Sequence, residues 1–289
     1  MFIPPLLDAL IRQALAEDLA GGDLTSDALF PRHSFVVGEA VAKSDLVVSG
    51  VDPFVRTFFL VSPGCRVEPL VEDGASVSAG TVLFRVEGET RGMLAAERTA
   101  LNFLQQLSGT ATLTRAFVDR AADRCRIVDT RKTIPGLRAL QRAAVRHGGG
   151  SNHRNSLGSA VLIKDNHIAA AGGVKIAVER ARAHAPHTTR IEIEVTDFDE
   201  LEEALAASAD IVMLDNFDDR QIREAVSRVA GRALVEVSGG VTLDRVEILA
   251  ASGVDVISVG ALTHSAPAAD ISLRLRAASA DAPTLGGRP

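Results

Sequence analysis

The sequence predicts an α/β protein in two parts, a small sheet domain followed by an incomplete α/β barrel. Strand-like pieces separated by glycine turns fill residues 34–90, whereas apolar runs and helical segments alternate from about 126 to 261. Six of these runs recur at intervals of roughly 20 to 33 residues, the length of a strand plus a helix. Each run ends in polar residues or glycine, as at the carboxyl-terminal rim of a barrel. A doubly wound open sheet is the competing architecture.

The first part begins with an amphipathic helix over residues 5–19, which the turn at 21–26 ends. The short strands that follow indicate a mostly antiparallel sheet, and a helix over about 92–107 closes the domain. The expected strands lie at 36–37, 46–48, 67–71 and 82–86.

In the second part, Pro135 and Gly136 open a helix that runs to about 147 and ends at three glycines. The tail from 266 to about 276 is expected to be helical, with Ile271, Leu273 and Leu275 as its apolar positions. The last dozen residues are rich in Ala, Pro and Gly, so we expect disorder there.

The composition is that of a soluble globular protein, with 46% hydrophobic and 24% charged residues among 289. The net charge of −6 argues against nucleic acid or an anionic membrane as the main partner. No secretory signal or membrane span is evident. Cys65 and Cys125 lack metal-type spacing and are interpreted as thiols of a reducing compartment, which predicts a cytoplasmic protein.

Cationic residues gather directly after the apolar runs. Arg131 and Lys132 follow the first run, His153 and Arg154 follow the three glycines, and Lys164 ends the next run. Taken singly, each group also fits a solvated basic turn or a flexible loop. Lys164 fits a Schiff-base nucleophile, an anion ligand or a salt-bridge partner of a neighbouring acid.

Arg98 is the most unusual cation of the first part. Its spacing from Leu94 and Leu101 puts its guanidinium in the apolar stripe of the helix. A buried charge needs a carboxylate or a bound anion, unless the side chain extends back to solvent.

Two carboxylates, Glu194 and Asp215, end successive strands, and Glu192 points the same way as Glu194 but deeper. Such a pair fits a divalent cation, ribose hydroxyls or positive charge on a sugar, or else ion pairs with nearby lysines. The glycine-rich turns after the last two runs are typical of phosphate binding. These features predict strongly anionic ligands, a sugar phosphate and a second acid. The turn residues are Ser238, Gly239, Gly240, Gly260, Ala261 and His264.

Several motifs together resemble the quinolinate phosphoribosyltransferase family, from about residue 5 to about 275. They include E-R-T-A-L-N at 97–102, D-T-R-K-T at 129–133, G-G-G-S-N-H-R at 148–154, L-I-K-D-N-H at 162–167, L-D-N-F at 214–217, E-V-S-G-G at 236–240 and V-G-A-L-T-H at 259–264.

The resemblance implies an N-terminal α/β sandwich domain over 1–108, rejoined by a C-terminal helix at 266–277. It implies an incomplete barrel of about seven strands over 109–265, leaving 278–289 as the tail. It also implies a homodimer or higher oligomer in which Arg98 enters the neighbouring subunit's site.

The resemblance further implies the reaction of quinolinate with phosphoribosyl pyrophosphate, giving nicotinate mononucleotide, pyrophosphate and carbon dioxide in NAD biosynthesis. Lys132, Glu194 and Asp215 are the implied catalytic residues. Glu194 and Asp215 are implied to hold the ribose and to act as ligands of the magnesium of the pyrophosphate, while the glycine-rich turns cradle the 5′-phosphate. The two substrates are bound by Arg98, Thr130, Arg131, Lys132, His153, Arg154, Lys164, Glu194 and Asp215.

The chain departs from the family pattern at Ser159 and Thr196, where an acid is usual, and these changes concern the support of Lys164 or Glu194. One alternative is a molybdenum-transport-associated homologue of the same fold, although the motifs eroded in that branch are intact here. The others are a lysine Schiff-base aldolase, which would use Lys164, and a non-catalytic phosphosugar-binding protein.

Overall fold

The computed structural model describes residues 4–31 and 33–278 and divides into two compact units. The first unit runs to Leu113 and adds 135–148 and the residues from Ala266 onward. The second unit, hereafter the barrel unit, consists of 114–134 and 149–265. Within the described ranges, no helix is both long enough and apolar enough to cross a membrane.

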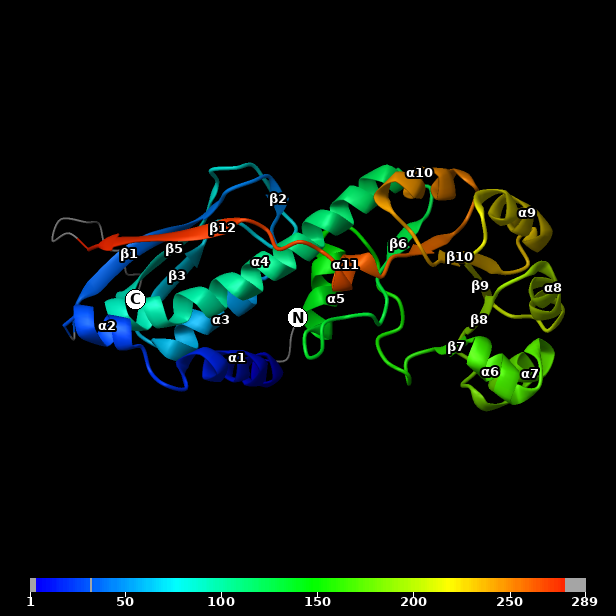
Figure 1. The fold of residues 1–289 in the computed structure, drawn as a ribbon, viewed down its shortest axis with the longest axis horizontal. Helices are drawn as coiled ribbons and strands as arrows, with labels where there is room; N and C mark the ends of the chain where they lie inside the picture. The colour runs from blue at the N-terminus through cyan, green and yellow to red at the C-terminus, as the bar shows by residue number, and fades with distance from the viewer. Residues whose placement is uncertain (1–3, 32, 279–289) are drawn as a thin grey trace. The chain divides into compact units, whose positions relative to one another are not determined.

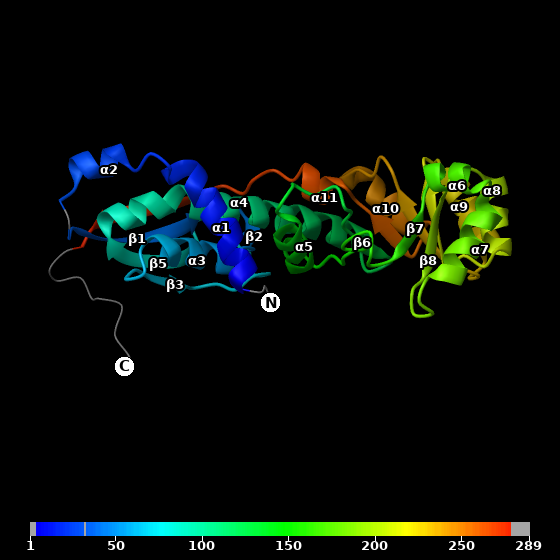
Figure 2. The same cartoon turned by 90° about the horizontal axis from the view of Figure 1, so that it is seen from below.

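The first unit packs a four-stranded antiparallel sheet against helices (Figure 2). One core lies between this sheet and α3 and α4, where Phe54 stacks on Phe84. A second core joins α1, α4 and α5. The strand order is β12-β1-β5-β3, with a separate β2–β4 pair. The elements are α1 (Pro4–Leu19), α2 (Leu24–Leu29), β1 (Phe35–Ala42), β2 (Leu46–Val47), α3 (Val51–Val61), β3 (Arg66–Pro69), β4 (Ser76–Val77), β5 (Val82–Glu89), α4 (Thr90–Ala121, which continues into the second unit), α5 (Arg138–His147) and β12 (Ile271–Ala277).

The helix predicted for the C-terminal tail is wrong, because these residues form strand β12. Ile271, Leu273 and Leu275 alternate with polar residues at a period of two, and β12 pairs antiparallel with β1 from Ala42↔Ile271 to Val36↔Ala277. The backbone donors of β1 thereby gain partners along that edge. Of the predicted disordered tail, only Ala278 belongs to the described residues, and its N–H donates to the carbonyl of Phe35.

Three helices of the first unit also differ from the sequence prediction. The apolar run Val51–Val61 is helix α3 rather than strand or loop. Helix α4 is about twice as long as predicted. Helix α5 begins at Arg138 rather than at Pro135, because Gly136 has a φ of +81° that no helical residue adopts.

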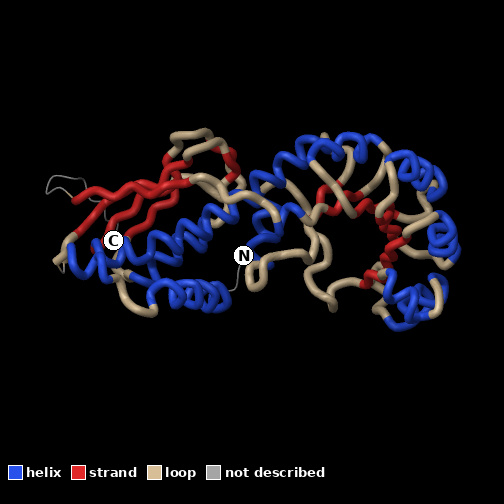
Figure 3. Tube along the Cα trace, in the orientation of Figure 1, coloured by secondary structure: helices blue, strands red, loops and turns tan. Residues whose placement is uncertain are grey.

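The barrel unit is a curved parallel sheet with helices on its outer face (Figures 1 and 3). In the strand order β6-β11-β10-β9-β8-β7, strands β7 to β11 follow in chain order and β6, the first strand of the unit, pairs with β11, the last. This circular order excludes the doubly wound alternative. All six strands fall where the apolar runs predict them. The elements are β6 (Arg126–Val128), β7 (Val161–Ile163), α6 (Asp165–Ala171), α7 (Val174–His184), β8 (Ile191–Val195), α8 (Phe198–Ala206), β9 (Ile211–Asp215), α9 (Asp219–Val229), β10 (Leu234–Ser238), α10 (Leu243–Ala251), β11 (Val256–Ser258) and α11 (Ala261–His264).

The sheet has six described strands, one fewer than the seven that the resemblance implies. The seventh position is reduced to a single parallel bridge between Val128 and Ser151. Ser151 donates to the carbonyl of Ile127 at 2.8 Å, so the segment after α5 lies beside β6. The sheet is therefore open between this segment and β7.

Side chains alternate between the two faces of the curved sheet. On β8, Ile191, Ile193 and Val195 are fully buried, consistent with packing under the outer helices, and Glu192 and Glu194 take the opposite, inner face. Met213 on β9 and Glu236 on β10 lie in register with Glu194. The inner face therefore carries carboxylates among apolar residues such as Met213, and that face carries the candidate site.

Candidate active site

A cavity of about 310 Å³ opens on the inner face of the barrel unit, at the carboxyl ends of its strands. Four of its lining residues are cationic, and they come from three separate segments of the chain. The cavity is lined by Thr130, Arg131, Lys132, His153, Arg154, Leu162, Lys164, Met213, Ser238 and Ser258.

Lys164 and Glu194 form an ion pair of 2.6 Å at the ends of neighbouring strands β7 and β8. Asp215 ends the next strand, and its pKa is raised by burial and then by repulsion from Glu194, against the attraction of Lys164 and Lys132. The two carboxylates are therefore close enough to repel each other. A cation between them would relieve that repulsion.

Arg154 lies near a second guanidinium. Burial, and then repulsion from Arg131, lower the pKa of Arg154. Two guanidiniums that repel each other in a partly buried site favour an anion with two negative groups.

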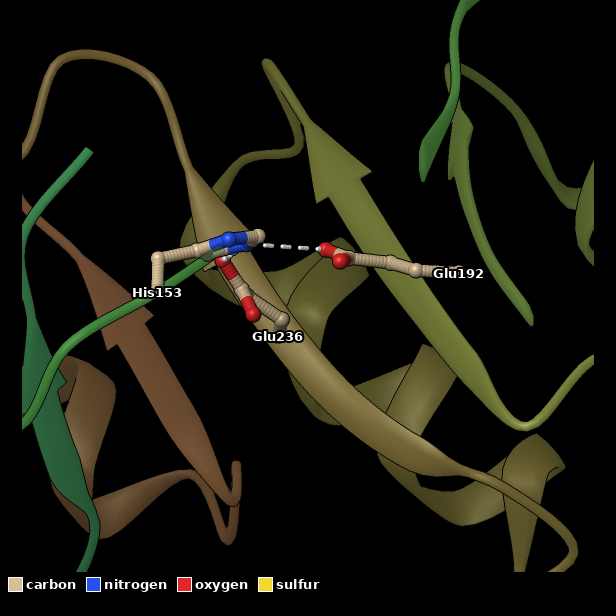
Figure 4. Close-up of side chains that lie close together, drawn as sticks. All are labelled: His153, Glu192 and Glu236. Atoms are coloured by element: carbon tan, nitrogen blue, oxygen red, sulfur yellow. Dashed lines mark hydrogen bonds and ion pairs between the residues drawn. The ribbon is translucent and has the colours of Figure 1, made fainter. Parts of the chain in front are cut away.

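His153 crosses the barrel interior and meets two buried carboxylates, Glu192 of β8 and Glu236 of β10 (Figure 4). Its Nε2 lies 3.3 Å from an oxygen of each. The side chains of His153, Glu192 and Glu236 are 12%, 5% and 4% exposed. Burial opposes a charge on the ring, but the two carboxylates outweigh burial and raise the pKa of His153. Burial raises the pKa of Glu192.

The segment that carries His153 is held by Asp129, which is fully buried at the end of β6. One oxygen of Asp129 accepts the N–H of His153 at 2.8 Å, and the other accepts the side-chain amide of Asn152 at 2.7 Å. Asp129 thus joins the loops of the D-T-R-K and N-H-R motifs at one strand end.

Lys132 is held by the segment that follows β11. The buried hydroxyl of Thr263 donates to the carbonyl of Lys132 at 2.8 Å. A Cβ at Gly260 would lie 3.2 Å from Cδ of Lys132 and 3.1 Å from Nε2 of His264. Glycine at this position therefore allows Lys132 and His264 to approach the same turn.

The turn after β10 lies against Asp215. Gly239 has a φ of +86°, and a Cβ there would lie 2.9 Å from Oδ1 of Asp215. Gly240 is also left-handed, with a φ of +58°. Both glycines are therefore required by the backbone, and the first also by the neighbouring carboxylate.

The structure brings most of the predicted site residues together in the barrel unit. Seven line the cavity, Glu194 is paired with Lys164, Gly239 lies against Asp215, and His264 lies by Lys132 and Gly260. Gly240 continues the turn after Gly239, and Ala261 is the first residue of α11. Ser159 bonds to Ser156, and Thr196 donates to Glu200, so both departures from the family pattern have partners within their own loops.

Arg98 belongs to the first unit. The sequence analysis put its guanidinium in the apolar stripe of α4, and this prediction is wrong. Arg98 is exposed, whereas Met93, Ala96 and Ala100 form the buried stripe. The helix is rotated so that Arg98 shares its exposed side with Asn102. Its guanidinium therefore needs no buried partner within the first unit.

Sequence reasoning missed several residues that build the site: Asp129, Leu162, Met213, Glu236, Ser258 and Thr263. A signal was available for two of them. Met213 and Glu236 stand two residues before Asp215 and Ser238, and therefore share their face of the sheet.

An open barrel with a cationic cavity and paired carboxylates at its strand ends defines an enzyme that acts on anionic substrates. Comparison with known proteins identifies the family. The C-terminal domain model of quinolinate phosphoribosyl transferase matches residues 110–274, and the N-terminal domain model matches 23–108. The chain therefore belongs to the quinolinate phosphoribosyl transferase family.

Named relatives are similar in sequence to this chain along nearly its whole length. The nicotinate-nucleotide pyrophosphorylase (carboxylating) of Mycobacterium leprae is 46% identical over 272 residues, covering 92% of this chain and 95% of the relative. The probable enzyme of the same name from Bacillus subtilis is 40% identical, covering 92% of each.

Solved structures are similar over the same extent. NadC from Streptococcus pyogenes has a TM-score of 0.92 at 38% identity, covering 96% of this chain and 99% of the other. The nicotinate-nucleotide pyrophosphorylase from Francisella tularensis has a TM-score of 0.91 at 40% identity, covering 96% and 98%.

Proposed function

We propose that this chain transfers the phosphoribosyl group of phosphoribosyl pyrophosphate to quinolinate with loss of carbon dioxide. The products are nicotinate mononucleotide and pyrophosphate, within NAD biosynthesis. The observation that carries the proposal is the cavity in which Arg131, Lys132, Arg154 and Lys164 converge beside the carboxylates of Glu194 and Asp215. Family membership and the named relatives support the same activity.

The charges of the cavity fit the two anionic substrates. Arg131 and Arg154 match the two adjacent carboxylates of quinolinate, because each guanidinium binds a carboxylate through paired hydrogen bonds. We assign Lys132 and Lys164, which also line the cavity, to phosphate oxygens. The turns around Ser238 and Gly260 offer backbone N–H groups to the 5′-phosphate.

The reaction balances without a covalent enzyme intermediate. The pyridine nitrogen of quinolinate forms a bond to the anomeric carbon of the sugar as the bond to the pyrophosphate oxygen breaks. Glu194 and Asp215 stabilise the positive charge that develops on the sugar, and Lys132 stabilises the leaving group. The ring nitrogen is then cationic, so the bond between ring carbon 2 and its carboxylate breaks and carbon dioxide leaves. The electron pair of that bond stays on ring carbon 2, which accepts a proton.

Glu194 and Asp215 also fit a magnesium ion, since they are two mutually repelling oxygen ligands at adjacent strand ends. Pyrophosphate oxygens would complete the coordination, and the bound ion would supply charge stabilisation to the leaving group. A homodimer with Arg98 in the neighbouring site and a cytoplasmic location are further parts of the proposal.

The test is a turnover assay with phosphoribosyl pyrophosphate, magnesium and either quinolinate or nicotinate, following nicotinate mononucleotide and carbon dioxide. We expect product with quinolinate and one carbon dioxide for each mononucleotide. No turnover of quinolinate by the folded protein would refute the proposal and favour the molybdenum-transport-associated branch. Borohydride trapping of a substrate on Lys164 would favour an aldolase instead.

A further inference from the structure

His153, Glu192 and Glu236, hereafter the His153 cluster, lie on the inner face of the barrel unit beside the cavity. His153 lines the cavity, whereas the two carboxylates are almost fully buried and are absent from its lining. Neither Glu192 nor Glu236 therefore has an assigned part in the reaction. Two buried carboxylates contribute less to stability than apolar residues of similar size would. Their presence therefore indicates a role other than stability.

The contacts of the imidazole define the role of the carboxylates. Nδ1 of His153 accepts the backbone N–H of Arg154 at 2.7 Å, so this nitrogen carries no proton and acts as the acceptor of a neutral ring. This N–H therefore opposes the second ring proton that the two carboxylates favour by raising the pKa of His153. The ring proton then lies on Nε2, which faces both carboxylates. Glu192 accepts a hydrogen bond from Nε2 at 3.3 Å, and Glu236 lies at the same distance.

The two carboxylates act on the backbone of Arg154 through the imidazole ring of His153. An imidazole held at Nε2 presents Nδ1 in a fixed direction, and the N–H of Arg154 is bonded to that nitrogen. Asp129 fixes the other side of the segment at the N–H of His153. The backbone from His153 to Arg154 is thereby tied at successive amides, and the guanidinium at the cavity wall starts from a fixed backbone.

A metal site is the competing interpretation. Among the described residues, the ligand atoms of this cluster all lie within 4.8 Å of one another. A metal-bound histidine normally donates its second ring N–H to an acceptor. Here the second nitrogen receives an N–H, so the ring geometry favours donation from Nε2 to carboxylates over coordination of a cation.

We propose that Glu192 and Glu236 are positioning residues that hold His153 through Nε2 and thereby fix Arg154 for binding of quinolinate. The inference rests on the proposed function, in which Arg154 binds a carboxylate of quinolinate. Glu192 has the larger share, because its contact with Nε2 has hydrogen-bond geometry, whereas Oε1 of Glu236 lies at the same 3.3 Å from Nε2 but is less well aligned.

The test compares variants that remove the acceptor with variants that keep it. Glu192→Leu and Glu236→Leu remove it, whereas Glu192→Gln and Glu236→Gln retain an amide oxygen that accepts from Nε2. We expect the KM for quinolinate to rise about tenfold or more in Glu192→Leu and less in Glu236→Leu. The KM for phosphoribosyl pyrophosphate should stay within about twofold, and the glutamine variants should stay near wild type.

A second measurement reads the ring directly. Nitrogen-15 spectra of histidine-labelled full-length protein, with His153 assigned through His153→Asn, should show a proton on Nε2 of His153 and none on Nδ1. The Glu192→Leu variant should shift this resonance, and the glutamine variants should retain it.

Three results would overturn the inference while leaving the proposed function intact. They are an unchanged KM for quinolinate in folded leucine variants, equal rises in both substrate KM values, and a proton on Nδ1. A rise in melting temperature on adding Zn²⁺ that His153→Asn abolishes would support the metal interpretation instead. Failure of wild type to turn over quinolinate would refute the proposed function, and the spectra would still test the ring geometry.

Discussion

The two ends of the parallel sheet in the barrel unit carry carboxylates with different partners. At the amino-terminal end, Asp210 accepts the N–H of Ile191 at 2.7 Å, and Asp255 accepts the N–H of Val235 at 2.8 Å. At the carboxyl-terminal end, Glu194 pairs with the side chain of Lys164. Asp210 also pairs with Arg182 at 2.8 Å, but both aspartates accept from strand backbone, whereas Glu194 pairs with a side chain that a ligand can replace.

The larger of the two cavities lies at the amino-terminal end of the sheet, which carries none of the predicted site residues. A cavity of about 910 Å³ lies at the amino-terminal end, where Arg190, Arg232, Asp210 and Asp255 are among its lining. Arg232 donates to the carbonyls of Arg228 and Val229, so its charge is used to close a helix end. Volume alone therefore does not identify the site, and the partners of the charged groups do.

The largest expected effect is a loss of activity on removing a cation from the carboxyl-terminal end of the sheet but not from the amino-terminal end. Lys132→Ala should lower kcat/KM about 10³-fold, because a preorganised cation at the leaving group is lost. Its stability should stay within about 0.5 kcal/mol, since the backbone contact to Thr263 remains. Steady-state kinetics and urea unfolding check both values. Arg232→Ala is the matched control, and a comparable loss of activity there would contradict the comparison.

Asp215→Asn should lower activity about 10²-fold and also stabilise the fold at neutral pH. Burial and repulsion from Glu194 raise the pKa of Asp215, so the folded state binds this proton more tightly than the unfolded state. Wild-type stability contributed by this group is therefore lost as pH rises through the folded-state pKa. Urea unfolding should show the gain at pH 7 and its disappearance in acid. A less stable variant at pH 7 would show that the carboxylate is favourably paired.

Gly239→Ala should raise the KM for phosphoribosyl pyrophosphate about tenfold, because its Cβ would displace Asp215. Gly231→Ala at the other end is the matched control, since Gly231 also has a positive φ but open space around its Cβ. Both variants should lose roughly 1 to 2 kcal/mol of stability from backbone strain. Equal KM values for phosphoribosyl pyrophosphate in the two variants would show that contact with Asp215 does not make Gly239 necessary for binding.

Asp255→Ala should have the smallest effect on activity. It leaves the N–H of Val235 without its acceptor, so the free energy of unfolding should fall by about 1 kcal/mol. Activity per folded molecule should equal that of wild type. Thermal unfolding together with active-site titration checks this, and a changed KM for either substrate would assign the amino-terminal end a part in binding.

The strands of the barrel unit could be predicted because β-branched runs are bounded by polar residues and recur with helices between them. Strand β12 was mistaken for a helix because three alternating apolar residues fit both periods in so short a segment. Helix α3 was missed because Val51–Val61 contains a buried apolar run, and periodicity does not separate such a helix from a strand.

The site could be predicted only as far as residues stand at strand ends. The tie from Asp129 to His153 spans 24 positions, and that from Thr263 to Lys132 spans 131. No local pattern encodes such contacts, because they depend on which strands become neighbours. The burial of Glu236 beside His153 likewise depends on β6, β8 and β10 facing one interior.

The most direct test is the KM for quinolinate in Arg131→Ala and Arg232→Ala, one substitution at each end of the sheet. The carboxyl-terminal site predicts a KM at least tenfold higher in Arg131→Ala and an unchanged KM in Arg232→Ala. An unchanged value in Arg131→Ala with a raised value in Arg232→Ala would place quinolinate in the larger cavity and contradict the account.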